Sequence, residues 1–141
     1  MNPSLKTEKA IDSWPDWDIT LHSRPKVLRV LNGGRSNRSF LLDSGGTRMV
    51  LRLNGIESVL PGANRSSEYA IWQAASAKGI APPLLYVDDR SGFLVSTFIE
   101  NDLPSQTTSN SVVAKHAFDL LARCHQLDLD VSSHHVGYFS L

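Results

Sequence analysis

The sequence has a single cysteine, Cys124, so it can form no internal disulfide and no metal site built from cysteines alone. It also has no net charge, because 14 Lys and Arg residues balance 14 Asp and Glu residues. A chain without net positive charge has no general electrostatic attraction to nucleic acid or to a membrane surface. There is no apolar run of about 18 residues and no secretory signal at the N-terminus. We therefore expect a cytoplasmic protein that binds neither nucleic acid nor membranes.

The order of apolar and turn residues predicts an α+β protein with a five-stranded, mostly antiparallel sheet and one inserted helix. Short loops join the first three strands, which favours an antiparallel meander over parallel crossovers. One of these loops is Gly45-Gly46, a tight-turn pair, and Gly79 marks the end of the inserted helix. The predicted strands cover 26–31, 39–43, 48–53, 84–87 and 93–99, and the predicted helix runs from about 64–67 to 78. In the first strand the side chains are expected to alternate regularly between two faces.

The two ends of the chain are organised differently. Residues 1–25 are polar and fit a short helix followed by a turn. Residues 101–111 read as a polar linker, and 111–127 as a second helix. This helix carries a clean apolar stripe, and Cys124 on it is predicted to be a small buried thiol. The stripe consists of Val113, Ala117, Leu120, Leu121 and Cys124.

A glycine-rich loop, 32–38, lies between two predicted strands. Dinucleotide-binding and Walker loops lead from a strand into a helix, so both are excluded here. A glycine hairpin that covers nucleotide phosphates fits better, because glycine lets backbone N–H groups approach the phosphate oxygens. Between Arg24 and Arg52 there are seven basic residues and one acidic residue, which gives an anion a place to bind. An ordinary hairpin loop remains the alternative.

Arg52 and Glu68 are predicted to form an ion pair. Arg52 lies among apolar residues near the end of the third strand, and Glu68 lies on the apolar face of the following helix. A carboxylate on a buried face needs a cationic partner. The alternative is that Glu68 only favours the start of its own helix, where an acidic residue is stabilising.

Together these features resemble the N-terminal lobe of the aminoglycoside phosphotransferase/choline kinase family, most of all its choline-kinase-like and thiamine-kinase-like branch. The resemblance covers about residues 26–127 and consists of six short motifs in the family's order. These are Gly-Gly-x-Ser-Asn at 33–37, Leu-Arg-Leu at 51–53, Asn-Arg-x-x-Glu at 64–68, Gly-Ile-Ala-Pro at 79–82, Leu-Val-x-x-Phe-Ile at 94–99, and Leu120–His125.

The resemblance implies a kinase-like nucleotide-binding lobe at 1–100, and a linker with the first helix of a second lobe at 101–141. The implied activity is transfer of the ATP γ-phosphate to an alcohol of choline, thiamine or an aminoglycoside-like metabolite, with Mg²⁺ as the cofactor of the full-length enzymes. The implied nucleotide-binding residues comprise a phosphate-covering group, an ion pair at the α/β-phosphates, and an adenine-facing segment. They are Gly33, Gly34, Ser36 and Asn37, then Arg52 with Glu68, and then Thr97, Phe98 and Ile99.

The sequence departs from the family at its C-terminal end. The motif His-x-Asp-x-x-x-x-Asn and the later metal-binding Asp are absent, and His125 belongs to the apolar helix pattern instead. We therefore expect no catalytic or metal-binding residue here, no phosphoryl transfer by this chain alone, and self-association through the uncovered helix stripe. The alternatives are a non-catalytic module that binds a nucleotide or a protein, or a gene fragment without a selected function.

Overall fold

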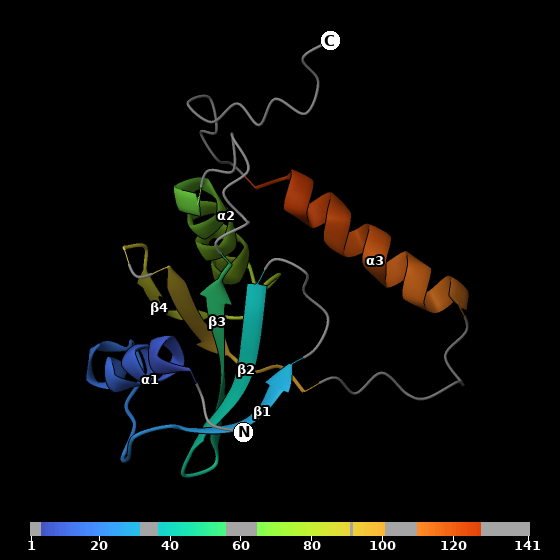
Figure 1. Cartoon of the computed structure of the whole chain (residues 1–141). Coiled ribbons are helices and arrows are strands. Elements are labelled where there is room, and N and C mark those ends of the chain that lie inside the picture. The colour runs from blue at the N-terminus through green and yellow to red at the C-terminus, as the bar shows by residue number, and fades with distance from the viewer. Residues whose placement is uncertain (1–3, 32–36, 56–64, 91, 101–109, 128–141) are drawn as a thin grey trace.

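The computed structural model describes residues 4–31, 37–55, 65–90, 92–100 and 110–127. Within these residues the chain forms three α-helices, one 3-10 turn and five strands (Figure 1). In chain order they are α1 (Leu5–Asp12), η1 (Trp14–Asp16), β1 (Lys26–Leu31), β2 (Asn37–Ser44), β3 (Thr47–Asn54), α2 (Arg65–Ala77), β4 (Leu84–Asp88), β5 (Phe93–Thr97) and α3 (Asn110–His125).

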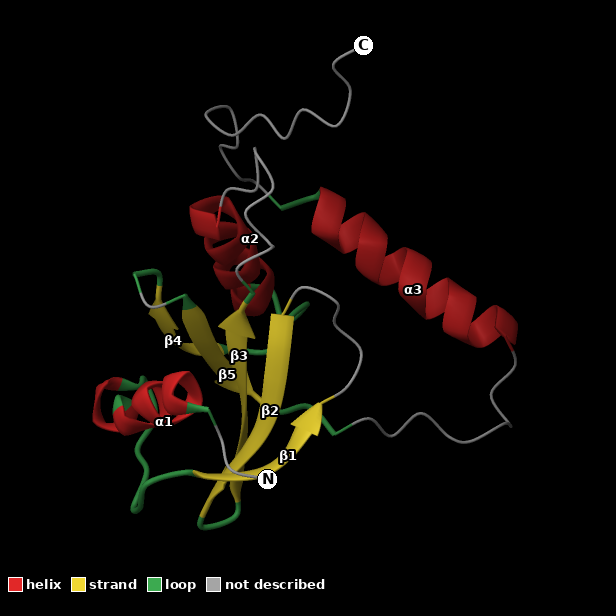
Figure 2. Cartoon of the chain, in the orientation of Figure 1, coloured by secondary structure: helices red, strands yellow, loops and turns green. Residues whose placement is uncertain are grey.

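The five strands form one antiparallel sheet in the order β1-β2-β3-β5-β4, with α2 inserted between β3 and β4 (Figure 2). This confirms the predicted α+β class and the predicted meander. The Gly45-Gly46 turn has φ angles of 58° and 91°, and Gly79 has a φ of 66° after the end of α2. These are left-handed conformations that glycine adopts without strain.

Two predictions about the strands are wrong. The strand predicted over 93–99 ends at Thr97, so Phe98 and Ile99 follow the sheet. The simple alternation predicted for β1 is interrupted by a bulge between Val27 and Arg29. The extra residue in a bulge shifts the side-chain alternation by one. As a result Val27 and Val30 both pack against the core, while Leu28 is 53% exposed.

One face of the sheet carries the hydrophobic core. Strand pairing places Leu42 opposite Met49 and Phe40 opposite Leu51, and all four side chains are buried. The N-terminal segment packs against this cluster through Ala10, Ile11 and Trp17. It is fixed to the sheet by a hydrogen bond of 2.7 Å from the Asp18 N–H to the Leu85 carbonyl oxygen. Residues 5–21, which the sequence left as a polar helix and turn, therefore complete the core.

The opposite face carries polar side chains and contacts α2. Because directly paired residues point to the same side, the pairs Asn37–Asn54 and Ser39–Arg52 share this face. Leu41 and Val50 continue it toward the Gly45-Gly46 turn. This second face holds the candidate site.

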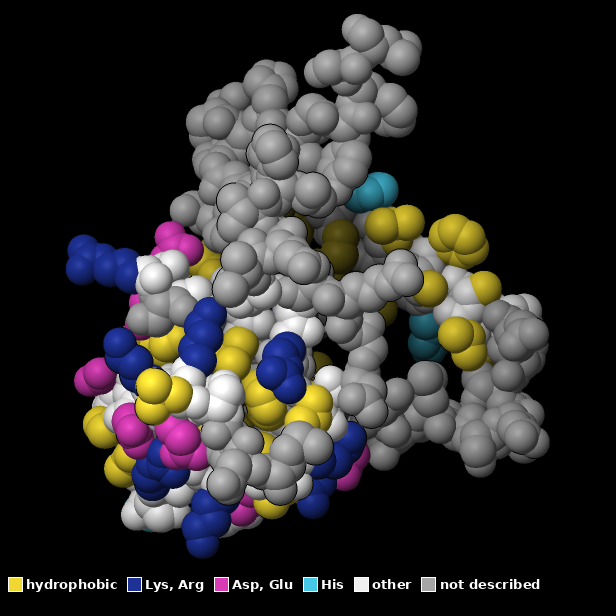
Figure 3. All heavy atoms as spheres, in the orientation of Figure 1, with side chains coloured by type: hydrophobic (Ala, Val, Ile, Leu, Met, Phe, Trp, Pro, Cys, Tyr) yellow, Lys and Arg dark blue, Asp and Glu magenta, His cyan; other side chains and the backbone are white. Residues whose placement is uncertain are grey.

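The C-terminal end of helix α3 approaches α2, and the rest of the helix extends away from it and from the sheet (Figure 1). Arg123 near its end donates a hydrogen bond of 2.8 Å to the Lys78 carbonyl oxygen. Its apolar side chains are largely open to solvent, as the yellow side chains along α3 in Figure 3 show; they include Val112, Val113, Phe118, Leu120 and Leu121. The prediction of a buried Cys124 is wrong, since the thiol residue is only half-buried on this uncovered helix. None of the helices in the described ranges is long and apolar enough to cross a membrane.

Replacing Leu51 with alanine should test the core. Its side chain is fully buried between the strands and the N-terminal segment, so the variant should lose about 2–5 kcal/mol of unfolding free energy. Leu28→Ala is the matched control, because a half-exposed leucine should cost no more than about 0.5 kcal/mol. Urea unfolding followed by circular dichroism measures both, and equal losses would contradict the placement of the core.

Self-association through α3 stays a prediction, which sedimentation velocity can test. The exposed apolar residues of this helix should drive concentration-dependent association. A Leu120→Glu/Leu121→Glu variant should sediment as a monomer at concentrations where the wild-type chain associates. A monomeric wild-type chain at tens of micromolar, roughly the range in which exposed apolar surface leads to association, would contradict the prediction.

Candidate functional site

The predicted pair between Arg52 and Glu68 is present. Nη1 of Arg52 lies 2.6 Å from Oε1 of Glu68, and the two side chains are 14% and 33% exposed. The pair joins β3 to the first turn of α2. Glu68 thus has both of the roles that the sequence left open. It is the acidic residue in the first turn of its helix, and it is the partner of Arg52. The ion pair anchors the helix at the polar face of the sheet.

Trp72 forms the third member of this group, and sequence reasoning missed it. The guanidinium carbon of Arg52 lies 5.5 Å from the centre of the Trp72 ring, within the range of a cation–π contact. The indole N–H donates a hydrogen bond of 2.8 Å to the Pro82 carbonyl oxygen, which fixes the ring. The signal was available, because Trp72 lies four residues after Glu68 and so on the same helix face.

The guanidinium of Arg52 keeps one edge unpaired. Its Nε and Nη2 atoms are buried, and neither has a hydrogen-bond partner within the part of the chain that the structure describes. These two N–H groups form the side of the guanidinium that accepts a carboxylate or phosphate in two parallel hydrogen bonds. A buried donor without a partner is costly. An anion that binds these two N–H groups would therefore be stabilising.

Two asparagines extend this polar group toward the glycine-rich loop. The Asn54 amide nitrogen donates a hydrogen bond of 3.0 Å to the Tyr69 hydroxyl of α2. The amide oxygens of Asn54 and Asn37 are buried, and among the described residues neither has a partner. The two residues are directly paired across β2 and β3. Only Asn37 was a predicted site residue, although Asn54 lies two positions from Arg52 and hence on its side of the strand.

The other end of the same face has a second ion pair. Arg48 donates a hydrogen bond of 2.9 Å to Glu100, and both side chains are largely exposed. Together with Asp43, Gly46 and Phe98 they line a cavity of about 450 Å³. The cavity lies where the chain leaves β5, in the segment predicted to face adenine.

The predicted site residues are only partly brought together. Gly33, Gly34 and Ser36 lie outside the described residues. The N–H groups of Thr97 and Phe98 already donate within the protein, to the carbonyl oxygens of Pro83 and Arg48. Ile99 is 64% exposed, and its N–H donates no hydrogen bond to the described part of the chain. Among the backbone N–H groups of the segment predicted to face adenine, that of Ile99 is therefore the one left for a ligand.

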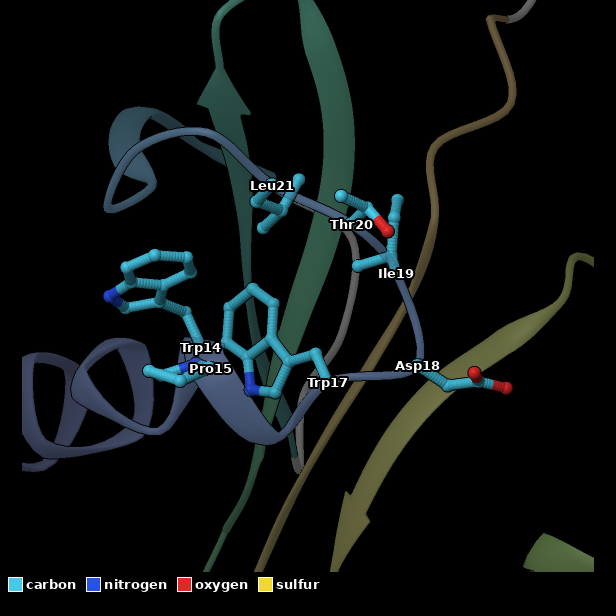
Figure 4. Close-up of a pocket in the computed structure, with 7 residues that line it drawn as sticks. All are labelled: Trp14, Pro15, Trp17, Asp18, Ile19, Thr20 and Leu21. Atoms are coloured by element: carbon cyan, nitrogen blue, oxygen red, sulfur yellow. The ribbon is translucent and has the colours of Figure 1, made fainter.

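A second cavity, of about 640 Å³, lies away from this site and is lined by the segment 14–21 (Figure 4). In the close-up the indoles of Trp14 and Trp17 approach Leu21, while Asp18 points away from them. Tyr86 packs against the same hydrophobic cluster as Trp14, and partial burial raises the pKa of its phenol, to which the carboxylates of Asp88 and Asp16 add. None of the predicted site residues lines this cavity.

No group of three or more His, Cys, Asp or Glu residues lies close enough to hold a metal ion within the described ranges. The described part of the site therefore consists of the Arg52 guanidinium and the amides of Asn37 and Asn54, and it contains no cluster of carboxylates.

The chain matches no family model and no curated protein. Among solved structures it is similar to choline kinase LicA from Streptococcus pneumoniae, with 24% sequence identity and a TM-score of 0.44 over 68% of this chain and 34% of that chain. It is also similar to a choline/ethanolamine kinase family protein from Mesorhizobium loti, with 21% identity and a TM-score of 0.41 over 79% of this chain and 33% of that chain. The chain spans about a third of the length of each.

A double-mutant cycle on Arg52 and Glu68 should show strong coupling. Each single variant, Arg52→Met or Glu68→Gln, should lose about 1–3 kcal/mol of unfolding free energy, because the partner is left uncompensated in a largely buried place. The double variant should lose clearly less than the sum. The exposed pair Arg48–Glu100 is the matched control, with an expected coupling of at most about 0.5 kcal/mol. Additive losses at Arg52 and Glu68 would show that the two side chains do not meet.

Proposed function

We propose that this chain is the ATP-binding lobe of a phosphotransferase that acts on an alcohol of a small metabolite. The observation that carries the proposal is the buried, unpaired edge of the Arg52 guanidinium. Glu68 and Trp72 hold the guanidinium from two other directions, so its orientation is fixed before a ligand arrives. A preorganised cation with two parallel donors is suited to a phosphate group.

The surroundings of Arg52 favour a phosphate over a carboxylate. Its neighbour on β2 is Ser39, two residues after Asn37, where the chain emerges from the glycine-rich loop. The resemblance assigns Gly33, Gly34, Ser36 and Asn37 to the cover of the phosphates. Backbone N–H groups of such a loop would add further donors.

The rest of the same sheet face offers a place for the adenine. Moving along β3 away from Arg52, the face becomes apolar at Val50 and its partner Leu41. Beyond them lies the chain after β5, where the Ile99 N–H is available. An apolar surface beside a backbone donor is suited to the flat, hydrogen-bonding ring of adenine. The order along the strand is thus adenine near Val50 and phosphates at Arg52.

The acceptor alcohol is proposed from the resemblance, with choline, thiamine and aminoglycoside-like metabolites as the candidates. In the family Mg²⁺ neutralises the charge that develops on the transferring phosphoryl group. For such a reaction the described residues supply a cation that binds phosphate, Arg52, and the two side chains that hold it, Glu68 and Trp72. They include no carboxylate cluster for the metal. We therefore expect nucleotide binding, and no phosphoryl transfer, from this chain alone.

Isothermal titration calorimetry with ATP tests the proposal. The wild-type chain should bind ATP, and Arg52→Gln should weaken the affinity at least about tenfold, because charge-assisted hydrogen bonds contribute roughly 1.5–3 kcal/mol. Arg38→Gln is the control, since this exposed arginine of β2 lies in the same basic segment but, paired with Leu53, on the opposite face of the sheet. Equal ATP affinities of the wild-type chain and the Arg52 variant would rule out the assignment.

A further inference from the structure

The polar face of the sheet has unmet hydrogen-bonding capacity at two levels. The first level is the Nε–Nη2 edge of Arg52, and the second is the pair of amides of Asn37 and Asn54. Asn54 follows Arg52 by two residues, so the two side chains share one face and their Cα atoms are about 7 Å apart. Burial without a partner is unfavourable at both levels. A ligand that extends along β3 from Arg52 to Asn54 would satisfy both.

Tyr69 determines which side of the Asn54 amide, the nitrogen or the oxygen, is left unpaired. The hydroxyl accepts a hydrogen bond from the amide nitrogen, which leaves the amide oxygen unpaired. A phenol hydroxyl donates as well as it accepts, so it supports the amide equally when that group is rotated by half a turn. The oxygen then accepts from Tyr69, and the two N–H groups of the amide take the unpaired position. In this orientation Asn54 is a donor for an anion.

We propose that Asn54, oriented by Tyr69 and flanked by Asn37, is a second phosphate anchor that makes the site selective for a polyphosphate chain. This inference rests on the proposed function and adds the basis of its selectivity. Arg52 binds the phosphate next to the nucleoside, and the reoriented Asn54 amide donates to a phosphate farther along the chain, on the side of the glycine-rich loop. ATP reaches both anchors, whereas AMP reaches only Arg52.

Calorimetric titration of the full 141-residue chain with ATP and with AMP tests the proposal. Asn54→Ala should weaken ATP binding about tenfold, the effect of losing a hydrogen bond to a charged group, and should change AMP binding less than threefold. Asn54→Asp should weaken ATP binding further than Asn54→Ala, because its carboxylate repels the distal phosphates, and again spare AMP. Tyr69→Phe, which keeps the ring and frees the amide, should lower the ATP-to-AMP affinity ratio in the same direction.

Arg38→Gln is the matched control. Arg38 is next to Asn37 in sequence, but its partner Leu53 places it on the opposite face of the sheet. It should change the ATP-to-AMP ratio less than threefold. If Asn54→Ala does not fold by circular dichroism, the ratio for Tyr69→Phe decides. Equal weakening of ATP and AMP, or no weakening of either, would overturn the second anchor while leaving the first in place. Absence of ATP binding by the wild-type chain would overturn the proposed function and this inference with it.

Discussion

The ion pair between Arg52 and Glu68 determines how the helix and the sheet fit together. A guanidinium that is only 14% exposed has to be compensated, and the carboxylate that does so comes from the first turn of α2. Once Glu68 faces Arg52, Tyr69 as the next residue of the helix faces Asn54. One turn later, Trp72 lies over the guanidinium. A single electrostatic requirement thus fixes both the position and the rotation of α2.

Much of this fold is predictable because its local signals agree with one another. Glycine pairs, helix-ending residues and apolar periodicity place all five strands and the inserted helix within a few residues. The bulge at Leu28 escapes such reasoning, since the residues around it alternate as they would in a regular strand. The early end of β5 escapes it as well, because Phe98 and Ile99 are good strand formers that lie beyond the last paired residue.

The site is predictable where charge is involved and less so where neutral polar groups are. A buried carboxylate and a strand cation imply each other, so Arg52 and Glu68 can be paired from sequence alone. Asn54 and Tyr69 carry no charge, and asparagine before a loop is also an ordinary turn residue. Their significance follows only from the register that sets Asn54 beside Asn37 and from the helix rotation that brings Tyr69 to it.

The alternation of β2 and β3 has a consequence for how such a protein can change over time. Residues with odd numbers between Asn37 and Asp43 contribute to the polar face, while the even-numbered Phe40 and Leu42 belong to the hydrophobic core. Apart from the buried Leu41, substitutions at these odd positions can therefore alter the polar surface with little effect on the hydrophobic core. Because neighbouring residues of one strand belong to different faces, single substitutions can change the polar face without a large loss of stability.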